Sequence, residues 1–80
     1  MVSELMDILW HTTGAGSDSP VGWRNHFAAA LGTDDYVRCE RLVASGHMEK
    51  GSETGYGHLF HATKAGINAV IEYKKQRSGT

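Results

Sequence analysis

The chain has 80 residues, of which 40% are hydrophobic and 21% charged, and its formal net charge at pH 7 is −1. This length allows one small domain over residues 1–80, and the composition is typical of a folded protein rather than a disordered one. A dedicated DNA-binding protein usually carries a basic surplus, which neutralises phosphates. The near-neutral charge therefore argues against strong non-specific binding to nucleic acid.

The sequence also gives an expectation about location. The longest apolar run, residues 27–31, is far shorter than the roughly 20 residues of a membrane span. The N-terminus is acidic and lacks the positive region of a signal peptide. A single cysteine, Cys39, excludes an internal disulfide. We therefore expect a cytoplasmic protein without a membrane partner.

A helix is expected over about residues 3–11, and it is unusually apolar. Leu5, Ile8 and Leu9 form one apolar stripe, and the polar face is narrow. A helix of this kind is either buried in its own domain or covered by another subunit. The second alternative makes Leu5, Ile8 and Leu9 candidate residues of a homodimer interface.

Residues 12–22 are rich in glycine, serine and threonine and contain the only proline, which predicts a loop. Trp23 and Phe27 follow with the i,i+4 spacing of a helix, which we expect over about residues 23–31, although an extended conformation also fits. The two aromatic residues are expected in the core.

The polar residues Arg24, Asn25 and His26 lie between these two aromatics. They are candidates for an exposed ridge that contacts a partner.

The next helix has clear signals at both ends. Thr33 is a good N-cap before the acidic first turn, and Gly46 is a typical stop. Arg38, Arg41 and Ser45 fall on its outward side. Residues 47–62 then predict a hairpin with a glycine-bearing turn, and Thr63 caps a last helix.

Two helices joined by the short turn at residues 32–33 and followed by a hairpin resemble a winged helix-turn-helix domain. Residues 42–49 resemble the end of the recognition helix in MarR-like regulators, and residues 58–66 resemble their wing strand and the start of the next helix. The resemblance implies an α+β fold, a small winged helix-turn-helix domain with the order α-α-α-β-β-α. The long terminal helices of MarR-type dimers are missing, and the tip of the wing has no arginine.

The resemblance implies double-stranded DNA as a partner, read by the third helix in the major groove. Arg38 and Arg41 would then contact bases or phosphates, with Ser45 and Lys50 assisting. The alternative is that Arg38 forms an i,i+4 ion pair with Asp34 on a solvated helix face.

The chain is also similar to small phage and prophage proteins of unassigned function. We therefore expect a non-catalytic winged-helix binding module of phage or prophage type, most specifically a DNA-binding transcriptional regulator. The alternative is a protein-interaction adaptor or inhibitor that dimerises through the apolar N-terminal helix.

The sequence predicts no enzyme, metal site or cofactor. The histidines and Cys39 lack the spacing of a zinc site, and His58 and His61 would point to opposite faces of a strand. Cys39 falls on the inward side of its helix, where a small apolar residue is expected. A domain of this size also encloses little space for a substrate.

Overall fold

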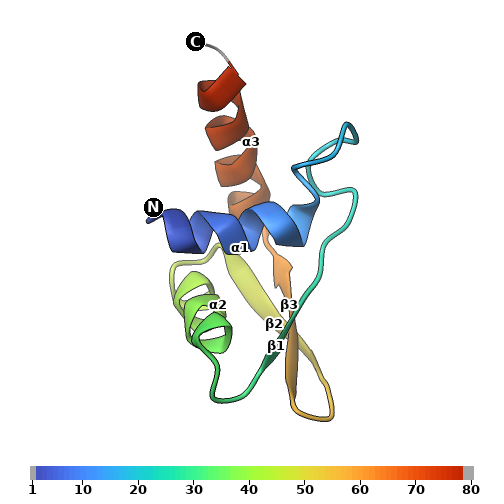
Figure 1. The fold of residues 1–80 in the computed structure, drawn as a ribbon, viewed down its shortest axis with the longest axis vertical. Coiled ribbons are helices and arrows are strands. Elements are labelled where there is room, and N and C mark those ends of the chain that lie inside the picture. Colours follow the sequence, from blue (N-terminus) through green and yellow to red (C-terminus); the bar gives the residue numbers. More distant parts are fainter. Residues whose placement is uncertain (1, 79–80) are drawn as a thin grey trace.

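The computed structural model describes residues 2–78 and contains three helices and one three-stranded sheet (Figure 1). In chain order the elements are α1 (Ser3–Thr13), β1 (Phe27–Ala30), α2 (Asp34–Ala44), β2 (Met48–Glu53), β3 (Gly57–Ala62) and α3 (Lys64–Ser78). The predicted α+β class is confirmed. The predicted hairpin is also found, since β2 and β3 fall within residues 47–62.

The sheet is antiparallel throughout, with the order β1-β3-β2. Phe60 of the central strand pairs with Phe27 of β1 on one side and with Lys50 of β2 on the other. Paired residues share a face of the sheet, so Phe27 and Phe60 point to the same side. Helices α1 and α2 pack on this side, and the side chains of Leu9, Leu42 and Phe60 are fully buried between the layers.

The prediction of a second helix over residues 23–31 is wrong: these residues contain no helix, and residues 27–30 form strand β1. Its alanines favour a helix, but pairing with β3 outweighs that local preference. The turn at residues 32–33 therefore joins a strand to a helix. Within residues 2–78 the order is α-β-α-β-β-α, and no short turn joins two consecutive helices. The helix-turn-helix part of the prediction and the order α-α-α-β-β-α are not met.

The loop predicted over residues 12–22 begins later, because α1 continues through Thr13. The hydroxyls of Thr12 and Thr13 donate hydrogen bonds to the carbonyls of Ile8 and Leu9, at 2.6 and 2.8 Å. Both threonines are completely buried. Both hydroxyls thus have hydrogen-bond partners inside the helix, so the two side chains are buried without an unsatisfied polar group.

Helix α3 extends away from the rest of the molecule (Figure 1). The principal extents of the whole molecule are 41, 23 and 18 Å. Helix α1 crosses near the base of α3 (Figure 1), and the side chain of Val70 in α3 is fully buried in the core. Across residues 2–78, the helices lack the length and apolar character needed to cross a membrane.

Candidate functional site

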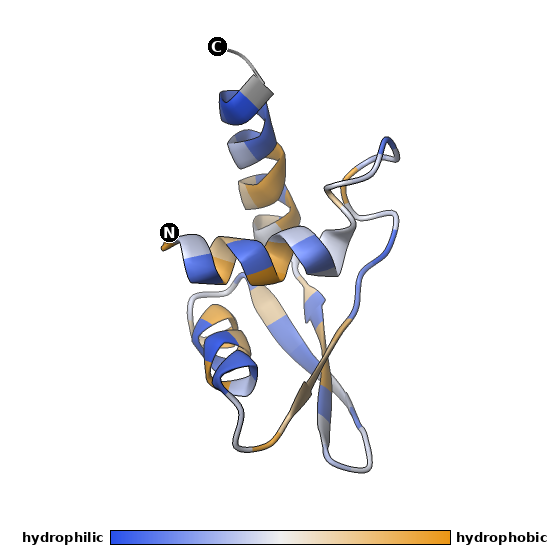
Figure 2. Ribbon diagram, in the orientation of Figure 1, coloured by the Kyte–Doolittle hydropathy of each residue, from blue (hydrophilic) through white to orange (hydrophobic). Residues whose placement is uncertain are grey.

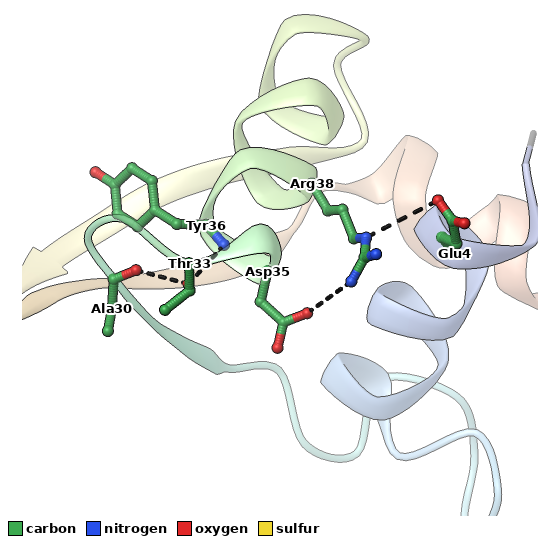
Figure 3. Close-up of polar contacts among 6 residues, drawn as sticks. All are labelled: Glu4, Ala30, Thr33, Asp35, Tyr36 and Arg38. Atoms are coloured by element: carbon green, nitrogen blue, oxygen red, sulfur yellow. Dashed lines mark hydrogen bonds and ion pairs between the residues drawn. The ribbon is translucent and has the colours of Figure 1, made fainter.

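The first turn of helix α2 is tied to the end of strand β1 through Thr33 (Figure 3). The Thr33 hydroxyl accepts a hydrogen bond from the Tyr36 backbone N–H at 3.2 Å and donates one to the Ala30 carbonyl at 2.7 Å. The buried Tyr36 ring packs edge-on against Phe60, with 5.4 Å between centroids. The N-cap predicted from the sequence is confirmed.

Arg38 lies between two carboxylates that come from different helices (Figure 3). Its Nη1 is 3.3 Å from Asp35 Oδ1, and its Nε is 3.9 Å from Glu4 Oε2 on α1. The predicted partner Asp34 is replaced by Asp35 and Glu4. Because both carboxylates face the guanidinium, the charge of Arg38 is compensated where it was predicted to contact DNA.

Lys50, also predicted to assist DNA binding, contacts a different flank of α2. Its Nζ donates a hydrogen bond to Glu40 Oε2 at 3.4 Å and lies 5.3 Å from the centre of the Tyr36 ring. The hydrogen bond with Tyr36 and the Glu40 carboxylate raise the pKa of Lys50 above its usual value. The ammonium thus already has an anionic and an aromatic neighbour.

Arg41 has no ion-pair partner within residues 2–78. It lines a shallow depression of about 280 Å³ together with Glu4, Asp34, Val37 and Arg38. Val37, a large apolar residue, is 51% exposed. Figure 2 shows hydrophobic and hydrophilic residues mixed along α2. The structure therefore places Arg38 and Arg41 in one depression with the apolar residue Val37 and the acidic residues Glu4 and Asp34.

The remaining residue of the predicted DNA surface, Ser45, lies at the end of α2. Its hydroxyl donates to the Leu42 carbonyl at 3.1 Å, and its Oγ is 2.7 Å from Nδ1 of His47. Ser45 thus has local partners that help to end the helix.

The three polar residues predicted to contact a partner have different roles. Asn25 is structural: its Nδ2 donates to the Ala62 carbonyl at 3.0 Å, and its Oδ1 accepts from the Ala62 N–H at 2.7 Å. Arg24 and His26 are exposed, with Arg24 Nη2 3.3 Å from His26 Nε2. Only these two belong to an accessible surface.

The candidate dimer residues lie in or against the core of their own chain. Leu9 is completely buried, Ile8 is 5% exposed, and Leu5 packs against this core. Helix α1 is covered by α2, α3 and the sheet, so its apolar stripe needs no second subunit. Ile8 and Leu9 are thus buried in their own chain, whereas Leu5 is only partly buried, and a dimer through this helix stays a prediction.

The sequence did not point to the exposure of Trp23, which was expected in the core but is 57% exposed. Its indole N–H donates to the Gly14 carbonyl at 3.0 Å. The tryptophan, asparagine and glycine of this loop form no periodic pattern in the sequence, because their contacts depend on how the loop folds back on α1.

The titratable groups of the interior have structural partners. Burial and the nearby Asp35 carboxylate raise the pKa of the Cys39 thiol to about 12. His58 contacts the Tyr36 hydroxyl at 3.0 Å, and His61 donates from Nδ1 to the Asn25 carbonyl at 2.6 Å. Among the described residues, histidine, cysteine and acidic side chains form no group of three or more that could hold a metal ion.

Comparison with protein-family models, curated proteins and solved structures finds no match to this chain. Its function is therefore inferred from the geometry of its own surfaces.

Proposed function

We propose that this chain is a non-catalytic binding module of the winged-helix type, from a phage or prophage, and that it binds a protein through the outer face of α2. The observation that carries this proposal is the pairing of Arg38 with Glu4 and Asp35. It makes the outer face of α2 a surface of balanced charge rather than a basic one.

A surface of this kind is suited to a protein partner. Val37 is half exposed and lies beside Asp34, Arg38 and Arg41 in one depression. An apolar centre with a charged rim of both signs is typical of protein interfaces, in which the rim charges set orientation and specificity. Burying Val37 would supply apolar area, and Arg41 would supply a charge for the partner to pair.

DNA reading by the same helix is the second candidate, and the hairpin that follows α2 favours it. Helix α2 is followed directly by the β2–β3 hairpin, as a recognition helix is followed by a wing, and Arg41 faces solvent. Against it, Glu4, Asp34 and Asp35 would approach the phosphates together with the arginines. Repulsion from these carboxylates would offset the attraction of Arg38 and Arg41.

A pair of measurements separates the two candidates. Cross-linking of the protein in a host-cell extract is expected to yield a defined protein partner. The Val37→Asp variant is expected not to cross-link to this partner. The control Ala65→Asp adds the same charge at an exposed position of α3 and is expected to retain it.

In parallel, the protein is titrated into a labelled duplex at about 50 mM salt. We expect no salt-sensitive binding, that is, none that weakens steeply as salt is added. Tight, salt-dependent duplex binding that Arg38→Ala and Arg41→Ala together abolish would replace the protein-binding proposal with the DNA-reading one.

A further inference from the structure

A second surface, separate from the outer face of α2, lies where the end of α1 meets the loop that follows it. It is a shallow slot of about 230 Å³ between Trp10 and Trp23. The other residues that line it are His11, Gly14, Gly16, Ser17 and Arg24. None of the lining residues is acidic, whereas Glu4 and Asp34 line the depression beside α2.

Trp23 is fixed in place although it is exposed. Its Nε1–H donates to the Gly14 carbonyl at 3.0 Å, and its backbone N–H donates to the Pro20 carbonyl at 3.0 Å. The indole lies directly against Gly14, where a side chain would collide with the ring, and Gly14 has a φ of 68° that favours glycine. The glycine thus permits the close approach, and the hydrogen bonds hold Trp23 in place while 57% of the residue stays exposed.

Basic groups surround this slot. Arg24 lines it, Lys74 donates from Nζ to the Ser17 carbonyl at 3.4 Å, and the Arg77 guanidinium lies 5.6 Å from the centre of the Trp10 ring. Helix α3 carries half of the eight basic residues of the chain against one acidic residue, Glu72. Two acidic residues are also near: Asp18 lies in the loop itself, and Asp7 lines a neighbouring depression with His11, which also lines the slot. Arg24, Lys74 and Arg77 thus outnumber the acidic residues placed beside the slot, in a chain whose net charge is −1.

We propose that the slot between Trp10 and Trp23 binds a nucleotide of a single-stranded nucleic acid. The base stacks on the exposed indole of Trp23, and the guanidinium of Arg24 contacts the adjoining phosphate. Stacking on a fixed aromatic ring requires an unpaired base, and a guanidinium matches the geometry of phosphate oxygens. Arg24 is already oriented by its contact with His26 at 3.3 Å, which leaves its other N–H groups for the ligand.

The test is an anisotropy titration of a fluorescein-labelled oligothymidylate of about ten nucleotides at about 25 mM salt. We expect binding by the wild type and a loss of at least about fivefold in affinity for Trp23→Ala. Arg24→Ala is expected to weaken binding and to reduce the slope of log K against log salt by about 0.7, the share of one phosphate on a single strand.

Matched controls make the same chemical changes away from the slot. Tyr56→Ala removes another exposed aromatic ring, and Arg41→Ala removes another exposed arginine. Both are expected to bind like the wild type. If Trp23→Ala folds poorly, Trp23→Phe serves as the second variant. It keeps an aromatic ring, so it is expected to retain more affinity than Trp23→Ala.

Three results would overturn the proposal. These are no binding of the oligonucleotide by the folded wild type, equal losses in the control variants, or equal competition by unlabelled duplex. A slot that serves a protein partner instead would give the first of these results.

Discussion

At the scale of single residues, Asn25 determines how the segment before β1 attaches to the sheet. Its side chain makes both hydrogen bonds that a strand neighbour would make to Ala62, which is buried. Asn25→Ala would leave the N–H and carbonyl of Ala62 without these partners. We expect the free energy of unfolding, measured by urea titration, to fall by about 2–4 kcal/mol. A fall below about 0.5 kcal/mol would show that Asn25 is not needed there.

Cys39 gives a pH-dependent prediction at the same scale. The pKa of its thiol is about 12 in the folded chain, against an ordinary value of 9.0. The thiol of the unfolded chain therefore ionises at lower pH than that of the folded chain. The stability of the folded chain is unaffected below about pH 9 and falls as the pH rises from about 9 towards 12. Relative to Cys39→Ala, the wild type should lose stability over that window, and its thiol should resist alkylation until the chain unfolds. Parallel stability curves for the two proteins would contradict this expectation.

At the scale of elements, local signals predicted α2 and the hairpin well. The cap Thr33 and the stop at Gly46 act within a few residues, so the sequence alone shows them. Strand β1 could not be predicted in this way. Its conformation depends on pairing with β3, about 30 residues further along the chain, and on Asn25 reaching Ala62.

Helix α1 gives the prediction at this scale. Ile8, a candidate residue of a dimer interface, is 5% exposed in the core of its own chain, and Ile8→Asp tests this packing. We therefore expect a loss of at least about 3 kcal/mol in unfolding free energy, because an unpaired carboxylate would be buried. Circular dichroism should show an unfolded or barely folded chain. A folded monomer formed from a wild-type dimer, seen by sedimentation, would contradict this packing.

At the scale of the whole molecule, charge is unevenly distributed. Eight of the nine acidic residues precede residue 54, whereas half of the basic residues lie on α3. The outer face of α2 carries charges of both signs, whereas three basic side chains, Arg24, Lys74 and Arg77, lie at or beside the slot at Trp23. The sequence placed Arg38 and Arg41 correctly on the outer face of α2. It could not show that Glu4, from a helix distant in the chain, would lie 3.9 Å from Arg38 and alter what that face can bind.

We propose that α2 does not read DNA and that nucleic acid, when bound, contacts Trp23. Amide chemical shifts of ¹⁵N-labelled protein test it directly, in titrations at low salt with a single-stranded oligothymidylate and with a duplex. We expect the single strand to shift the indole N–H of Trp23 and the amide of Arg24, and the duplex to leave the amides of residues 37–41 unmoved. Saturable shifts of residues 37–41 with duplex, and none at Trp23 with the single strand, would contradict the claim.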